Sequence, residues 1–113
     1  MRAQKNYPDQ LNLADFLDKS LLILDDDDPL RGRLSRAMEK KGFIVKEAKN
    51  VSEGLQIVAK NPPAFALVDL RLDDGNGLDV VKQLSKVKKD CRIVMLTGYG
   101  NWPTAVAAVK DAA

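Results

Sequence analysis

The sequence contains no histidine and only one cysteine, Cys91, among its 113 residues. The first absence excludes acid–base catalysis by a histidine of this chain. The second excludes a disulfide within the chain and a cysteine-rich metal site, and it predicts that Cys91 is a half-buried, inert thiol beside a strand. Sites that depend on imidazole or on several thiolates are therefore excluded.

Long apolar runs and a strong charge of one sign are also missing. No run approaches the roughly 18 apolar residues of a membrane-spanning helix, and the N-terminus lacks the pattern of a secretory signal. The net charge of +2 is too small to imply binding to nucleic acid or to a membrane by itself. We expect a cytoplasmic chain without membrane contact.

The length and the composition, with 45% hydrophobic and 30% charged residues, predict one domain with a modest core. Residues 20–113 are expected to form this domain. Residues 1–19 are expected to be a tail that is disordered or loosely docked, with at most one short amphipathic segment.

Four short apolar runs predict the strands of the domain: residues 21–24, 43–45, 65–68 and 93–96. Each run is too continuous for a strand with one wet face, which indicates buried parallel strands. Apolar residues at helical spacing lie between them, with one helix expected to follow an aspartate N-cap and another to follow Asn50. The pattern predicts an α/β fold with a doubly wound parallel sheet.

Four consecutive aspartates, residues 25–28, follow the first apolar run. Like charges about 4 Å apart repel by roughly 4 kcal/mol at a protein surface, so this cluster is unfavourable unless it is solvated, protonated or bound to a cation. Capping of the next helix needs only Asp27 or Asp28. Asp25 and Asp26 therefore need another explanation.

Asp69 ends the third apolar run and Thr97 follows the fourth. In an open parallel sheet the carboxyl ends of the strands share one rim, so both residues are expected near Asp25 and Asp26. Three carboxylates without histidine or cysteine suit a hard, octahedral cation, above all Mg²⁺. A carboxylate beside Mg²⁺ and a hydroxyl suggests phosphoryl chemistry, in which an aspartate becomes an acyl phosphate.

The order of these motifs resembles the receiver domain of two-component response regulators. The matching pieces are LLILDDDD, VDLRL, GNGLDVV and IVMLTGYG. The phrases MEKKGF, VDLRLDDGNGLDVV and LTGYGN are similar to the redox-responsive RegA/PrrA/ActR group. The resemblance implies a flavodoxin-like (CheY-like) fold with strand order 2-1-3-4, and the family's lysine, fifth strand and last helix are expected to be missing from this chain.

The resemblance also implies roles for individual residues. Asp69 would accept a phosphoryl group from a sensor histidine kinase. Asp25 and Asp26 would hold Mg²⁺ together with Asp69, and the backbone carbonyl of Arg71 would complete the protein ligands. Thr97 would be the switch hydroxyl that reports phosphorylation. The chain would thus be a signalling phosphoacceptor and not an enzyme beyond its own phosphorylation and slow dephosphorylation.

The sequence departs from the family pattern in the loop after the acceptor. Receivers commonly carry a proline where this chain has Asp73, so Gly75 and Gly77 are expected to supply the turn. By analogy, Arg71 and Tyr99 would tune the access of hydrolytic water; for Tyr99, a partly exposed loop aromatic is the alternative.

The resemblance implies partners as well. The kinase is one, and DNA would be contacted only through a helix-turn-helix output domain that this chain lacks, in transcription regulation. An exposed edge at residues 92–96 predicts self-association by edge pairing, by exchanged elements or by burial of a bared apolar face.

Two alternatives stay open at this point. LILDDDD also fits a Mg²⁺-dependent phosphohydrolase of the haloacid dehalogenase type, with Asp25 as nucleophile and Asp27 as general acid. The short chain, the missing cap domain and an unused Asp69 argue against it. The other alternative is a pseudo-receiver, an interaction module that never carries phosphate.

Overall fold

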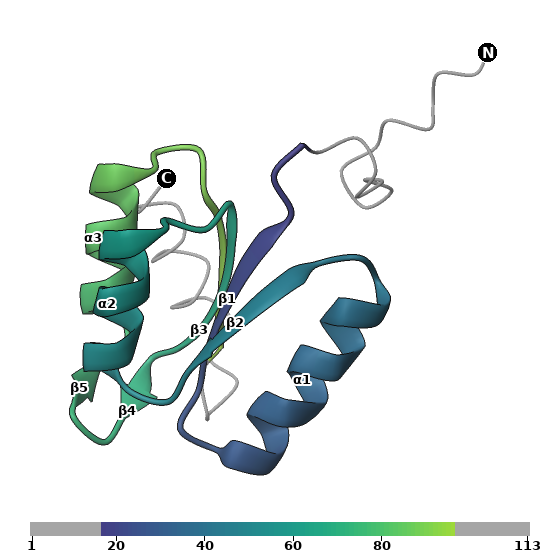
Figure 1. The fold of residues 1–113 in the computed structure, drawn as a ribbon. Coiled ribbons are helices and arrows are strands. Elements are labelled where there is room, and N and C mark those ends of the chain that lie inside the picture. Colours follow the sequence, from purple (N-terminus) through teal and green to yellow (C-terminus); the bar gives the residue numbers. More distant parts are fainter. Residues whose placement is uncertain (1–16, 97–113) are drawn as a thin grey trace.

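The computed structural model describes residues 17–96 (Figure 1). The predicted amphipathic segment of the tail lies almost wholly outside the described residues, as do Val106 and Val109, whose spacing in the sequence predicts a fourth helix. Thr97 and Tyr99 also lie outside them. The described part contains the four predicted strands and the helices between them.

The sheet has four parallel strands in the order β2-β1-β3-β6. Their bounds are Ser20–Leu24 for β1, Ile44–Ala48 for β2, Phe65–Asp69 for β3 and Arg92–Leu96 for β6. Because β6 is the fourth strand of this sheet along the chain, the predicted order 2-1-3-4 is confirmed. Leu24 at the end of β1 pairs with Ala48 on one side and with Val68 on the other.

Helices cover both faces of the sheet, as a doubly wound fold requires. Helix α1 (Asp28–Lys40) lies on one face, and α2 (Val51–Lys60) and α3 (Leu78–Val87) lie side by side on the other (Figure 1). The predicted caps are confirmed. The Asp27 side chain accepts a hydrogen bond of 3.0 Å from the Leu30 N–H, and the Asn50 side chain accepts one of 2.8 Å from the Glu53 N–H.

A short antiparallel hairpin between β3 and α3 was not predicted. It consists of β4 (Arg71–Leu72) and β5 (Gly75–Asn76). Gly75 has a φ of +152°, a conformation that favours glycine, so its predicted part in the turn is confirmed. Two-residue strands leave no periodicity in a sequence, which is why the hairpin was missed.

The core lies around β1 and between the sheet and its helices. Leu22, Ile23 and Leu24 are fully buried, and Leu22 and Leu24 belong to one cluster with Val68 of β3 and Leu84 of α3. For the central strand β1, the predicted burial is correct.

For the outer strands, the prediction of full burial was wrong. Ile44 in β2 is 66% exposed and Val94 in β6 is 47% exposed. Both strands have one hydrogen-bonded neighbour within the described sheet. A continuous apolar run therefore did not distinguish an edge strand from a central one.

Cys91 is half-buried next to β6, and burial raises the pKa of its thiol to about 12, as expected for an inert thiol. Within residues 17–96, none of the helices has the length and apolar character needed to span a membrane.

Candidate functional site

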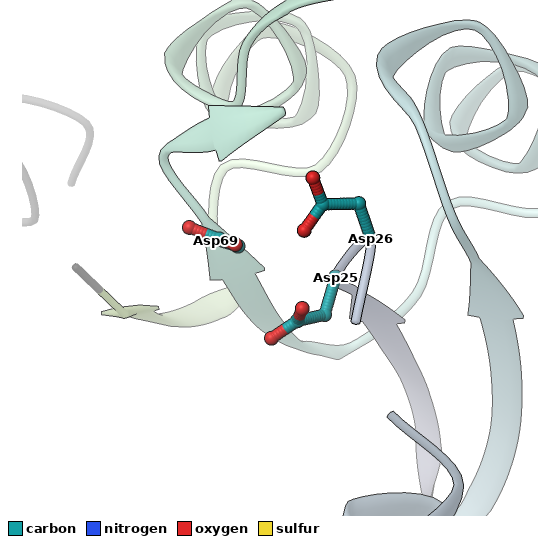
Figure 2. A group of neighbouring side chains, drawn as sticks. All are labelled: Asp25, Asp26 and Asp69. Atoms are coloured by element: carbon teal, nitrogen blue, oxygen red, sulfur yellow. The ribbon is translucent and has the colours of Figure 1, made fainter. Parts of the chain in front are cut away.

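Three aspartates meet where β1 and β3 end. Asp25 directly follows β1, Asp26 is the next residue, and Asp69 is the last residue of β3. Because β1 and β3 are parallel neighbours in register, their carboxyl ends lie side by side. Figure 2 shows the three side chains gathered at this rim, and one carboxylate oxygen from each lies within 4.8 Å of the others. The predicted convergence is therefore observed.

Backbone N–H groups hold two of the three carboxylates in place. The Asp27 N–H donates to Oδ1 of Asp25 at 2.8 Å, and the Arg71 N–H donates to Oδ1 of Asp69 at 3.0 Å. Neither bond uses the second oxygen, Oδ2. Each side chain is thus oriented by the loop that follows it, with an oxygen left to act as a ligand.

The cluster carries more negative charge than its described neighbours offset. The Asp25 residue is only 3% exposed, and burial raises the pKa of its carboxyl, with the charges of Asp26 and Asp27 adding to the effect. Burial also raises the pKa of Asp69, and the charges of Asp25 and Asp26 raise it further. Repulsion of this kind is relieved by a proton or by a cation.

The donor set fits a hard divalent cation. Three carboxylates at the ends of two neighbouring strands offer oxygen ligands alone, which is the chemistry that Mg²⁺ prefers, and a Mg²⁺ ion held by few carboxylates keeps positions for water or phosphate. Clusters of exposed acids are common without an ion, but Asp25 is buried and its repulsion is not relieved by capping. The residues present are therefore suited to Mg²⁺.

Gly77 has a different role from the one expected. Its φ of −56° is open to any residue, so it is not needed for conformational freedom in the turn. A Cβ atom at this position would overlap the carbonyl oxygen of Asp69 and would lie 2.8 Å from Cγ1 of Val68. Gly77 is thus the residue that allows the start of α3 to approach the backbone of Asp69.

Two polar residues with long-range hydrogen bonds were not predicted. Arg31 donates hydrogen bonds to the Asp25 carbonyl and to two carboxylates. Asp74, in the β4–β5 hairpin, accepts hydrogen bonds from the Val51 and Ser52 N–H groups at 2.8 and 3.1 Å and so caps α2. The spacing of Arg31 three residues after Asp28 indicates an ion pair on a helix. The contacts of Arg31 with Glu47 and of Asp74 with Val51 span 16 and 23 residues, and no local pattern in the sequence predicts them.

The haloacid dehalogenase alternative assigned Asp27 as a general acid. The Asp27 carboxylate instead accepts the hydrogen bond from the Leu30 N–H that caps α1. Asp69, which that alternative left unused, lies in the cluster. The local geometry therefore favours the receiver interpretation.

Comparisons with known proteins agree with this arrangement. The sequence model of the response regulator receiver domain family matches residues 21–113. The chain is 60% identical over 93 residues to the photosynthetic apparatus regulatory protein RegA of Cereibacter sphaeroides, covering 82% of this chain and 50% of that protein. It is 53% identical to the acid tolerance regulatory protein ActR of Rhizobium meliloti, covering 82% and 48%. The chain thus spans about half the length of these relatives.

Solved structures are similar as well. One is a Burkholderia pseudomallei response regulator with a phosphorylated aspartic acid, a calcium ion and citrate (TM-score 0.76, 40% identity, covering 85% of this chain and 56% of that one). Another is the response regulator TrrA of Thermotoga maritima in complex with Mg²⁺ and BeF (TM-score 0.71, 26% identity, covering 80% and 81%). The fold, the resemblance to RegA and ActR, and the family match lead to one conclusion: this chain belongs to the response regulator receiver domain family of two-component signalling.

Proposed function

We propose that this chain is a Mg²⁺-dependent phosphoacceptor, in which Asp69 takes a phosphoryl group from a phosphohistidine of a sensor histidine kinase. The observation that carries the proposal is the convergence of Asp25, Asp26 and Asp69 at the strand ends of a receiver fold. The phosphorylated aspartic acid and the Mg²⁺ and BeF complex named for two similar structures support it.

The chemistry assigned to Asp69 is a displacement at phosphorus. Oδ1 of Asp69 accepts the Arg71 N–H, and the carboxylate has two oxygens, so one can stay with Mg²⁺ while the other attacks phosphorus. A bond forms between this oxygen and phosphorus while the bond between phosphorus and the imidazole nitrogen breaks, and that nitrogen keeps the electron pair and takes up a proton. Bound Mg²⁺ would offset the charge of the carboxylates and of the transferred group.

Further roles belong to the same proposal. Asp25, Asp26 and Asp69 hold Mg²⁺, and the carbonyl of Arg71 completes the protein ligands. Thr97 is the switch hydroxyl: it directly follows Leu96, which pairs with Asp69 in the sheet. Hydrolysis of the acyl phosphate is slow, so the protein is a signalling phosphoacceptor and not a phosphatase.

The relatives suggest how the phosphorylated domain is used. RegA and ActR are named regulatory proteins, and the 93 matched residues make up about half of each. We propose that residues 20–113 form a receiver domain, after a tail of residues 1–19, in a cytoplasmic regulator whose DNA-binding output domain controls transcription in response to redox signals. DNA contact would occur only through that output domain, and no membrane is involved.

Self-association is part of the proposal. Within the described sheet, β6 pairs only with β3, and its residue Val94 is 47% exposed. We expect two copies to associate through this edge, by exchanged elements or by the apolar face beside it. Sedimentation at rising concentration should show a dimer, and a strictly monomeric profile would rule the association out.

Phosphorylation with a small donor tests the proposed function. The protein is incubated with acetyl phosphate, with Mg²⁺ or with EDTA, and phosphoprotein is separated on a phosphate-affinity gel. We expect phosphoprotein from the wild-type chain with Mg²⁺ only, and none from Asp69→Asn. The adjacent loop variant Asp73→Asn is the matched control and should be phosphorylated normally. Equal labelling of Asp69→Asn and wild type would refute the role of Asp69.

A further inference from the structure

The guanidinium of Arg31 joins three segments beside the acidic cluster. Nη1 donates to the backbone carbonyl of Asp25 at 2.8 Å, Nη2 donates to Oδ1 of Asp28 at 2.7 Å, and Nε donates to Oε1 of Glu47 at 3.0 Å. The end of β1, the first turn of α1 and strand β2 are thereby connected through one side chain. That side chain is only 15% exposed.

The three contacts require the planar, multidentate guanidinium group of an arginine. The three nitrogen atoms of the planar guanidinium point in fixed directions, and here each has its own acceptor. The two carboxylates hold the guanidinium in place and offset its charge. The donor aimed at the Asp25 carbonyl is therefore oriented by the two other hydrogen bonds of the guanidinium.

The Asp25 carbonyl matters because it belongs to the peptide unit that connects Asp25 to Asp26. The N–H of Asp25 is fixed by a hydrogen bond of 3.1 Å to the Ala48 carbonyl of β2, and the bond from Arg31 fixes the other side of the residue. The side chain of Asp26 accepts no hydrogen bond from the residues between 17 and 96. Its direction therefore depends on how this peptide unit is held.

We propose that Arg31 is a positioning residue for the Mg²⁺ site, which holds the Asp25–Asp26 peptide so that Asp26 faces Asp69. The inference rests on the proposed function, because it concerns the same acidic cluster. It adds a residue that contacts neither the ion nor the phosphoryl group and that acts through the backbone of a ligand.

The sign of the effect separates positioning from simple charge. Arg31 is a cation close to a proposed cation site, so removing its charge alone should strengthen Mg²⁺ binding. Loss of positioning should weaken it, and removal of groups that orient metal ligands typically costs about 10-fold or more in metal affinity. The two explanations thus predict opposite changes for the same substitution.

The test is the Kd of Mg²⁺, measured by titration calorimetry on the full chain. We expect Arg31→Gln to raise the Kd about 10-fold. Arg31→Lys keeps the charge but cannot serve three acceptors with fixed geometry, so it should also raise the Kd. The matched control is Arg33→Gln, an exposed arginine two residues along the same helix, which removes the same charge and should leave the Kd unchanged or slightly lower.

A kinetic measurement distinguishes positioning from general damage to the fold. With acetyl phosphate as donor, the Mg²⁺ concentration for half-maximal phosphorylation should rise in Arg31→Gln, while the rate at saturating Mg²⁺ should return to near the wild-type rate. If Arg31→Gln does not fold, as judged by circular dichroism, Arg31→Lys and Glu47→Gln are measured instead. Both should raise the Kd of Mg²⁺, by less than the roughly 10-fold increase expected for Arg31→Gln.

The outcomes separate this inference from the proposed function. If wild type binds Mg²⁺ and the folded Arg31 variants bind it equally well or more tightly, positioning by Arg31 is refuted and the proposed function stands. If wild type binds no Mg²⁺, or if Asp69→Asn binds it as wild type does, the proposed function fails and the inference fails with it.

Discussion

At the scale of single residues, the acidic site depends on the absence of a side chain at Gly77, which lies against the backbone of Asp69. A Cβ on Gly77 would overlap the Asp69 carbonyl oxygen, which is backbone and cannot move without moving the carboxylate. We predict that Gly77→Ala lowers the free energy of unfolding by about 1–3 kcal/mol, the usual cost of overpacking, and weakens Mg²⁺ binding. Urea denaturation measures the first effect and calorimetry the second.

Gly32→Ala is the matched control for this prediction. A Cβ at Gly32, within α1, would lie 3.3 Å from the flexible end of Arg36. Replacement of glycine by alanine in a helix interior stabilises by about 0.5–1 kcal/mol, so this variant should be more stable than wild type. Equal stability of the two alanine variants would contradict the role given to Gly77.

The raised pKa values of Asp25 and Asp69 predict how Mg²⁺ binding depends on pH. Burial is the main cause for both carboxyls, and neighbouring aspartates add to it. Because a protonated carboxyl is a poor ligand for a cation, the Kd of Mg²⁺ should rise as pH falls, beginning above the usual aspartate value of 3.8. Calorimetric titrations between pH 7 and pH 4 measure this, and a constant Kd over that range would contradict the prediction.

The raised pKa values of Asp25 and Asp69 also affect the stability of the metal-free protein, which should increase in mild acid. A carboxyl whose pKa is raised by folding disfavours the folded state when it is charged, and this penalty disappears as pH falls through the folded pKa towards the unfolded one. Without Mg²⁺, these two groups alone should therefore make the fold more stable in mild acid.

At the scale of elements, the hairpin after β3 is tied to α2 by one carboxylate. Hydrogen bonds from the Val51 and Ser52 N–H groups hold the pKa of Asp74 below its usual value of 3.8. Asp74→Asn removes the charge at the helix N-terminus and offers one acceptor oxygen, not two. We predict that this variant unfolds at a lower urea concentration than wild type at pH 7.

The pH dependence of this difference follows from the sign of the shift. A group whose pKa is lowered by folding stabilises the fold above its unfolded pKa, and the contribution is lost as pH falls through the folded pKa. The gap between wild type and Asp74→Asn should therefore close below about pH 3.8. Asp73→Asn changes the exposed neighbour and should be as stable to urea as wild type both at pH 7 and in acid. If Asp74→Asn stays less stable than wild type in acid, the charge of the Asp74 carboxylate is not the cause of the difference.

The elements differ in how far the sequence predicts them. Asn50 and Asp27 act through bonds to N–H groups three residues away, so the helix starts could be read locally. The exposure of β2 could not be predicted from the sequence, because the residue types of Ile44 and Val45 are equally suited to an edge strand and to a central one. The bond between Arg31 and Glu47 joins residues that only the folded sheet brings together.

At the scale of the whole molecule, the meeting of Asp25 with Asp69 was predictable because it follows from topology. Any doubly wound parallel sheet places the carboxyl ends of neighbouring strands at one rim, whatever the details of packing. The direction of each side chain was not predictable, since it depends on the backbone bonds from Asp27 and Arg71. The role of Thr97, outside the described residues, stays a prediction.

The balance of charge in the whole fold gives a further prediction. Without Mg²⁺, Asp69→Asn should have a higher Tm than wild type, because it removes one of three repelling carboxylates. With Mg²⁺ the order should reverse, since ligand at 100 times its Kd stabilises wild type by about 2.7 kcal/mol and the variant by less. Thermal denaturation with and without Mg²⁺ measures both, and a Tm of wild type that does not respond to Mg²⁺ would count against the site.

Hydride trapping can show whether Asp69 is the residue that carries the phosphoryl group. Borohydride reduces an aspartyl phosphate to homoserine, which peptide mass spectrometry can locate after reaction with acetyl phosphate and Mg²⁺. We expect homoserine at position 69 and at no other aspartate. Homoserine at position 25 would contradict this expectation and would favour the phosphohydrolase chemistry instead.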